Sequence, residues 1–343
     1  MVLELEQKIR LQEIGAIKIG NKGEERTSQG GNTYRLPQKL DYFLIVTKEK
    51  DAGGNFVPNE KIMKRLGEHP TALDIMLLYD DIDLNFYTFY GLYKGRKCLC
   101  HGDGRMAIRR KKDGSQEEIV CDRNNCKFSK KDENGNQQCK LNGILQVLLK
   151  ESNIVGGVHI FRTTGWNSCS NLIASMLLIQ NITGGMLAGI PLKMTLQPKS
   201  VLPEGSNSYR TVYVVNIIYP QSQEKLLETA VEIAKRRMTA GVELRKIHQK
   251  AKLISAPLEE SDDAARDVVE EFYPEAQDQF VEYIEDDTSA SLIKKDDEEP
   301  EIVENFDDGD FSEEENQNGK NNGNNNVKNN GGQQEDLLIE GVL

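Results

Sequence analysis

The sequence has few of the residues from which active sites are usually built. Its histidines number only four, at widely separated positions: His69, His101, His159 and His248. No GxSxG, HExxH or GxxxxGK[ST] pattern occurs. Asp80, Asp81 and Asp83 are neighbours, but a solvated turn explains them better than a catalytic carboxylate pair does. We therefore predict a protein that binds, and not an enzyme.

Long apolar runs are also missing. No run approaches the ~18 residues that span a bilayer, and the start Met1-Val-Leu-Glu-Leu-Glu lacks the charged and apolar regions of a signal peptide. Six cysteines in 343 residues are too few to indicate a disulfide scaffold. We expect a cytoplasmic protein that makes no membrane contact.

Charge is distributed very unevenly along the chain. Of its 55 acidic and 43 basic residues, 28 acidic and five basic residues lie between positions 253 and 343. That segment carries a net charge of −23, whereas residues 1–252 carry +11. A basic body suits a polyanionic or acidic partner, although charge retained only for solubility is an equally good explanation.

Hydrophobic periodicity predicts an α+β body over residues 1–252, with antiparallel strands and at least three helices. The expected strands cover residues 8–20 (a pair), 40–46, 72–79, 85–93, 141–149, 156–164, 187–197 and 209–219, and the expected helices 58–67, 166–183 and 221–252. Residues 21–32 and the insertion at 98–140 are expected to be loops. Residues 253–286 form an acidic linker with a short helix, and the Asn/Gly-rich residues 287–343 a disordered acidic tail.

Two helices allow finer expectations. Asn167 or Ser168 is expected to cap the helix at 166–183, in which Cys169 is expected to be a small buried side chain. In the helix at 221–252, a stripe at helical spacing is expected to face the core. This stripe consists of Leu227, Val231, Ala234, Met238 and Val242.

Five of the six cysteines fall within 42 residues of polar sequence. Cys121 and Cys126 are close enough for one turn to present both thiolates, and Cys139 follows after twelve residues. Zn²⁺ in structural sites takes four such ligands in a tetrahedron. We predict a structural zinc site at Cys100, Cys121, Cys126 and Cys139. Cys98 is the alternative to Cys100, and His101 is a further substitute. Four protein ligands leave no open position for catalysis.

Basic residues accompany these cysteines and predict a surface that contacts nucleic acid or a protein partner. A solvated loop is an equally good explanation. The residues are Arg105, Arg109, Arg110, Lys111, Lys112, Lys127, Lys130 and Lys131.

Five motifs occur in an order that resembles a known family. They are IGAIKIGNKG at 14–23, RLPQKLDYF at 35–43, CHGDGRMAIRR at 100–110, the Cys121/Cys126/Cys139 set and FRTTGWNSCSNLI at 161–173. Together they resemble the phage recombination directionality factors that act with large serine integrases, over about residues 8–240.

The resemblance implies a phage or prophage protein acting in the cytoplasm of a bacterial host. Such a factor binds the integrase on attachment-site DNA and promotes excision between attL and attR over integration between attP and attB. An alternative is a replication-associated single-stranded DNA-binding protein. In that alternative, the aromatics of the strand at 85–93 (Phe86, Tyr87, Phe89 and Tyr90) stack on bases, although packing in the core explains them better.

Overall fold

The structure is a computed structural model that describes residues 11–27, 33–52, 55–95, 97–131, 137–152, 154–202, 207–241, 265, 268–269 and 271–273. All of them belong to one compact unit, Met1–Ser291. The acidic tail predicted at 287–343, most of the linker predicted at 253–286, and residues 242–252 of the last predicted helix lie outside the described residues.

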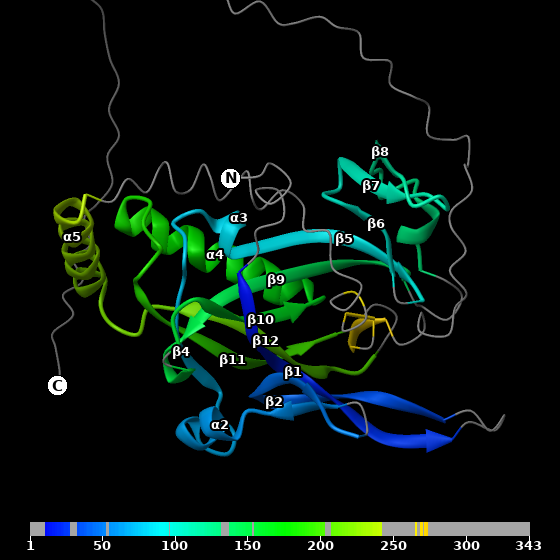
Figure 1. Ribbon diagram of the computed structural model, residues 1–343, viewed down its shortest axis with the longest axis horizontal. Helices are drawn as coiled ribbons and strands as arrows, with labels where there is room; N and C mark the ends of the chain where they lie inside the picture. Colours follow the sequence, from blue (N-terminus) through cyan, green and yellow to red (C-terminus); the bar gives the residue numbers. More distant parts are fainter. Residues whose placement is uncertain are drawn as a thin grey trace, which may run out of the picture. The chain divides into compact units, whose positions relative to one another are not determined.

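Twelve strands form a mostly antiparallel sheet (Figure 1). They are β1 (Gln12–Thr27), β2 (Thr33–Lys50), β3 (Phe56–Pro58), β4 (Ala72–Met76), β5 (Phe86–Lys94), β6 (Lys97–Gly102), β7 (Met106–Arg110), β8 (Gln116–Val120), β9 (Cys139–Leu149), β10 (Gly157–Thr163), β11 (Pro191–Val201) and β12 (Arg210–Ile218). Nine follow one another as β3-β2-β1-β10-β9-β5-β6-β7-β8. β4 joins β9 to β11, and β11 pairs with β12. Only β1 and β10 are parallel among the named strand pairs. The α+β prediction is confirmed.

Four α-helices accompany the sheet in the described part of the chain: α2 (Glu60–Leu66), α3 (Ile82–Asn85), α4 (Trp166–Thr183) and α5 (Gln223–Thr239). α4 contacts β12 and α5. It buries Leu172, Met176 and Ile179, which recur at helical spacing, in the main core. Each such side chain contributes about 1.5–3 kcal/mol on burial. Among the described residues, no helix is both long and apolar enough to cross a membrane.

The prediction of a strand pair at 8–20 is wrong, because β1 is a single strand that runs from Gln12 to Thr27. Residues 21–27 of the loop predicted at 21–32 belong to β1 for the same reason, and residues 28–32 lie outside the described residues. Gly20 and Asn21 stay in the ladder because Lys39 and Gln38 of β2 pair with them. Gly15 is required where β1 passes β10. A Cβ there would lie 2.7 Å from the Val46 carbonyl oxygen and 3.1 Å from His159 Cδ2.

Much of the insertion predicted as a loop is folded as the strands β6, β7 and β8. Two tight turns make this possible. Asp103 Oδ1 accepts hydrogen bonds from the N–H groups of Arg105 (2.7 Å) and Met106 (2.8 Å). Asp113 Oδ1 accepts one from Ser115 N–H at 2.9 Å. Asp followed by a Gly at positive φ is typical of such turns. The polar composition of the insertion therefore reflects strands that are exposed to solvent, and not an irregular backbone.

Helix details also differ from the expectation. Gly165 is the N-cap of α4 and provides no side-chain cap. Ser168 is instead buried, and its Oγ accepts a hydrogen bond from Val215 N–H at 3.2 Å.

On α5, Leu226 and Ala230 are buried, whereas Leu227, Val231 and Met238 of the predicted stripe are 42%, 52% and 82% exposed. The two stripes differ by one residue in phase. The prediction is therefore wrong about which face of α5 is buried: the face of Leu226 and Ala230 packs against the protein, and the face of Leu227 and Val231 is exposed.

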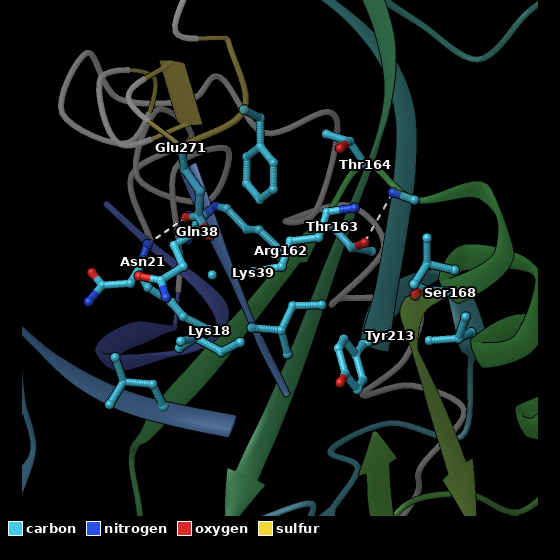
Figure 2. Close-up of a pocket in the computed structure, with 18 of the residues that line it drawn as sticks. Lys18, Asn21, Gln38, Lys39, Arg162, Thr163, Thr164, Ser168, Tyr213 and Glu271 are labelled. Carbon is cyan, nitrogen blue, oxygen red and sulfur yellow. Dashed lines mark hydrogen bonds and ion pairs between the residues drawn. The ribbon is translucent and has the colours of Figure 1, made fainter. Parts of the chain in front are cut away.

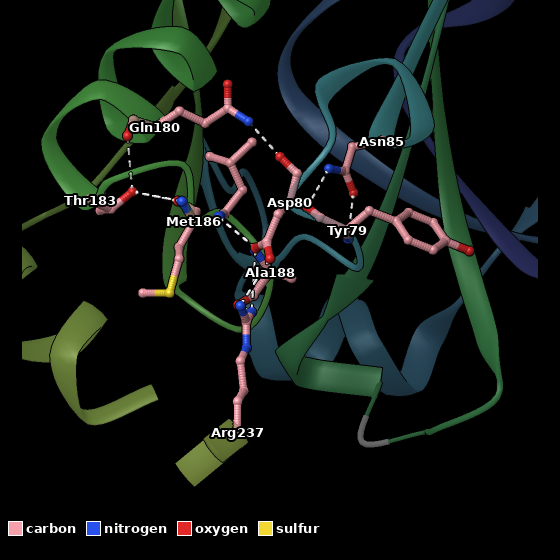
Figure 3. A network of polar contacts seen from close by, with 9 residues as sticks. Tyr79, Asp80, Asn85, Gln180, Thr183, Met186, Ala188 and Arg237 are labelled. Atoms are coloured by element: carbon pink, nitrogen blue, oxygen red, sulfur yellow. Dashed lines mark hydrogen bonds and ion pairs between the residues drawn. The ribbon is translucent and has the colours of Figure 1, made fainter. Parts of the chain in front are cut away.

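Asp80 is a structural anchor, and the prediction of a solvated turn is wrong for it (Figure 3). Its Oδ1 accepts hydrogen bonds from the N–H groups of Leu187 (2.9 Å) and Ala188 (2.8 Å). Arg237 Nη1 of α5 lies 2.9 Å from Asp80 Oδ2 and both side chains are largely buried, at 18% and 16% exposure. Asp80 thus ties the β4–α3 connection to the segment after α4 and to α5.

A segment far along the chain packs on the sheet at β5, β6 and β9. The described residues Ala265, Val268, Val269 and Tyr273 are buried with Tyr93 in a second apolar cluster. Tyr273 Oη donates to the Gly91 carbonyl oxygen at 3.0 Å. Lys18 Nζ lies 2.5 Å from Glu271. These residues of the predicted linker are therefore part of the folded body.

Candidate zinc site and cationic surface

A β-bulge separates the two cysteines of β6. Tyr93 of β5 pairs with Cys98, and Leu92 pairs with Cys100, so that Leu99 is the extra residue. Adjacent strand residues point to opposite faces. Cys98 therefore shares the face of Tyr93 and packs against the apolar cluster of Tyr273. Cys100 shares the face of Leu92.

Cys139 starts β9 and pairs with Leu92 on the other side of β5. Cys100 and Cys139 therefore flank Leu92 on one face. Sequence alone left Cys98 as an alternative to Cys100, because the bulge cannot be recognised from spacing. The strand register favours Cys100 as the neighbour of Cys139.

The turn after β8 brings Cys121 and Cys126 together. Cys121 N–H donates to the Arg105 carbonyl oxygen at 2.8 Å, and Cys126 N–H donates to that of Asp122 at 2.8 Å. The Asp122 carboxylate accepts from Asn124 N–H at 2.9 Å and from the Asn125 amide at 2.6 Å. A short 3₁₀ helix, η1 (Lys127–Ser129), follows. Small polar residues thus form the compact turn that their sequence predicts.

The four thiols lie within one another's electrostatic field. Burial, with a smaller contribution from thiolate charge at Cys100, Cys126 and Cys121, raises the pKa of Cys139 to about 12. Burial is also the main reason that the pKa values of Cys100 and Cys121 are raised, with added contributions from neighbouring thiolates. Such a cluster resists ionisation until a cation is present to hold the thiolates.

This donor set suits Zn²⁺ in chemistry and number. Within the described ranges, however, no group of three or more His, Cys, Asp or Glu side chains is arranged to hold a metal ion. The thiols are neighbours, but they do not form a closed tetrahedron. The zinc site remains a prediction.

The predicted cationic residues are spread over several elements. Arg105 lies exposed in the turn before β7. Lys111 and Lys112 follow β7, and Lys111 lies 3.3 Å from Glu117. Lys127, Lys130 and Lys131 are exposed after Cys126.

The two arginines of β7 differ in their surroundings. Arg109 pairs with Cys100 across the strands. Burial raises the pKa of that thiol, and the charge and hydrogen bond of Arg109 offset part of the rise. Its Nε is buried, so Arg109 supports the thiol cluster. Arg110 is half-buried on the same strand.

Sequence reasoning missed Arg123, which lies inside the Cys121–Cys126 turn. Its guanidinium Cζ is 3.7 Å from the centroid of the Tyr90 ring. Its position between two predicted ligands was the only signal that could have drawn attention to it. Phe86 and Phe89 of the same strand are buried, as the core explanation expected, whereas Tyr87 and Tyr90 are half-buried.

A pocket of about 350 Å³ opens beside the first turn of α4 (Figure 2). Polar and apolar side chains line it in similar numbers, with Tyr213 and Phe272 among the apolar ones. Lys18 and Arg162 bring positive charge to it, and Glu271 pairs with Lys18. The polar groups therefore converge from β1, β10 and the segment at 271–273.

A family model matches residues 14–220, which are more than half of the chain. The chain belongs to the Gp3-like family, described as recombination directionality factor-like. This family assignment confirms the resemblance recognised in the sequence motifs. The matched range begins in β1 and ends just after β12, so the family region contains most of β1, all of β2 to β12 and the cysteine-bearing extension. No curated protein and no solved structure matches the chain.

Proposed function

We propose that the chain is a directionality factor that binds a large serine integrase on attachment-site DNA. In this proposal it promotes recombination of attL with attR and disfavours recombination of attP with attB. The observation that carries the proposal is the family match over residues 14–220. The net charge of +11 on residues 1–252 also favours a partner assembled on DNA.

The proposed mechanism is a shift of populations. A factor that binds the excisive arrangement of the integrase more tightly than the integrative one changes the outcome by that difference in affinity alone. A difference of about 3 kcal/mol changes the ratio of products by roughly a hundredfold. The factor itself makes and breaks no covalent bond, which agrees with the absence of recognisable catalytic motifs in the sequence.

We assign the zinc ion a structural role within this function. Cys100, Cys121, Cys126 and Cys139 would hold it, and it would supply the charge that keeps four thiolates together. The ligands come from β6, the turn after β8 and the start of β9. The metal would thus fasten the β6–β8 extension to the main sheet, leaving a cationic surface in a fixed orientation. The proposed location is the cytoplasm of the bacterial host.

The test is a plasmid recombination assay with the cognate large serine integrase. Adding the purified chain should raise the yield from an attL/attR plasmid and lower it from an attP/attB plasmid. Co-purification on attachment-site DNA should show that the two proteins associate. A plasmid with one inactivated attachment site serves as the control for nonspecific effects. Unchanged yields on both plasmids, with no association, would overturn the proposal.

A further inference from the structure

Trp166 lies where three cavities meet. It lines the pocket of about 350 Å³ beside α4, a second cavity of about 600 Å³ and a third of about 390 Å³. The second and third cavities also share Tyr90 and Leu141, and Thr164 is shared by the first and second. We call the lining of these three neighbouring cavities the Trp166 groove. Trp166 is 66% exposed, which is unusual for the largest apolar side chain.

The middle of the groove is cationic. Arg123, Lys131 and Lys140 line the cavity of about 600 Å³, and none of its described lining residues is acidic. Lys140 is fixed in place, since its Nζ donates to the Phe272 carbonyl oxygen at 2.9 Å and lies 4.7 Å from the Tyr273 ring centroid. Its charge is therefore held beside the groove.

Planar groups accompany these charges. The Arg123 guanidinium lies over the Tyr90 ring at 3.7 Å, and the Trp166 indole borders the same cavity. At the other end of the groove, the close-up shows Arg162 and Tyr213 around the first pocket (Figure 2). An exposed indole next to an arginine–tyrosine stack offers two flat surfaces beside the cations of the middle cavity.

We propose that the Trp166 groove binds a nucleic acid strand with unpaired bases. Bases stack on aromatic rings and on guanidinium planes, and the cations follow the phosphates. A duplex presents no free base face to an indole at the surface of a protein. An acidic peptide would use the cations but would cover Trp166 only where an aromatic side chain happened to fall, whereas every nucleotide carries both a phosphate and a planar base. This inference goes beyond the proposed function, because binding an integrase requires no contact with bases.

The experiment uses the full chain and the fluorescence of Trp166, which is its only tryptophan. Single-stranded oligothymidylate of about 15 nucleotides is the probe. Saturable quenching is expected at low salt and should weaken as salt rises. A duplex of the same length should bind more weakly.

Variants are compared by the anisotropy of a labelled oligonucleotide. Trp166→Ala and Lys131→Ala should each raise Kd, Trp166→Ala on the order of tenfold, whereas Trp166→Phe should retain most of the affinity. Tyr209→Ala removes a tyrosine that is 73% exposed, and Lys64→Ala removes an exposed cation of α2. Both matched controls should leave Kd unchanged.

Three results would overturn the inference: no saturable quenching, duplex binding as tight as that of the single strand, or a Kd unaffected by Trp166→Ala. Competition by polyglutamate as strong as that by the oligonucleotide would assign the groove to an acidic protein instead. Because the assay contains no integrase, its failure leaves the proposed function standing.

Discussion

The Tyr273 hydroxyl accepts a hydrogen bond from the Asn142 side-chain amide at 2.9 Å, across 131 residues of sequence. Both side chains are buried, at 1% and 5% exposure. The Tyr273 ring also lies 4.7 Å from that of Tyr93. This contact fixes the segment at 265–273 to the sheet next to the cysteine-bearing extension.

We predict that Tyr273→Ala lowers the free energy of unfolding by about 3–5 kcal/mol, because it leaves a large cavity. Tyr273→Phe should cost about 1–3 kcal/mol, since the Asn142 amide and the Gly91 carbonyl lose a buried partner. Urea unfolding measures both, with Tyr209→Ala as the exposed control at less than about 0.5 kcal/mol. Equal stability of Tyr273→Ala and the unmodified chain would show that the segment does not pack there.

A second prediction concerns the anchor at Asp80. Asp80→Ala removes the acceptor for two backbone N–H groups and leaves Arg237 without its carboxylate. Breaking a buried ion pair in this way costs about 3–5 kcal/mol. Glu232→Ala is a fitting control, because its pair with Arg236 is exposed on α5 and contributes less than about 0.5 kcal/mol. Similar losses in the two variants, measured by urea unfolding, would contradict the assigned role of Asp80.

The sequence predicted those features that depend on local patterns. The antiparallel pair β9 and β10 and the end of α4 at Gly184, which has φ +67°, follow from alternation and from glycine's access to that conformation. Contacts between distant segments were not predictable. Neither the partner of Asp80 nor the buried position of Tyr273 can be recognised without knowing which strands are neighbours.

The same distinction explains the error at α5 and the choice that the sequence left open between Cys98 and Cys100. Leu226 and Leu227 both lie on apolar stripes, and only packing against α4 decides which stripe is buried. Cys98 and Cys100 are equivalent by spacing, until the bulge at Leu99 places them on opposite faces.

A third prediction separates these two cysteines. Ser replacement at Cys100, Cys121, Cys126 or Cys139 should release bound zinc or weaken it strongly, because each removes one of four thiolates. Cys98→Ser should retain one zinc ion per chain. Metal content by atomic absorption, together with a colorimetric chelator titration, measures this. Zinc retained in Cys100→Ser and lost in Cys98→Ser would reverse the assignment.

Zinc binding should also weaken as pH falls, since protons compete with the metal for the thiolates. The raised pKa values of Cys100, Cys121 and Cys139 mean that binding releases protons at neutral pH. Proton release, measured by calorimetry in two buffers of different ionisation enthalpy, should therefore accompany zinc uptake. An equal heat in both buffers would argue against thiolate ligands.

The last prediction concerns His159, which is 1% exposed on β10. Burial lowers its pKa from 6.5, and the nearby Glu13 only partly opposes that effect. Above pH 6.5 neither the folded nor the unfolded chain binds a proton at this site, so stability is unaffected. Below that pH the unfolded chain binds the proton first. The folded state then loses up to about 1.4 kcal/mol per pH unit, until the folded-state pKa is reached.

Urea midpoints between pH 7.5 and pH 5 should therefore fall more steeply for the unmodified chain than for His159→Gln, which cannot titrate. His69→Gln, which removes an exposed histidine, is the matched control for the loss of an imidazole. The comparison of slopes removes the contribution of carboxylates, since these are common to all three proteins. Parallel slopes for the unmodified chain and His159→Gln would mean that His159 has the same pKa in the folded and unfolded states, because the charge of Glu13 fully offsets burial.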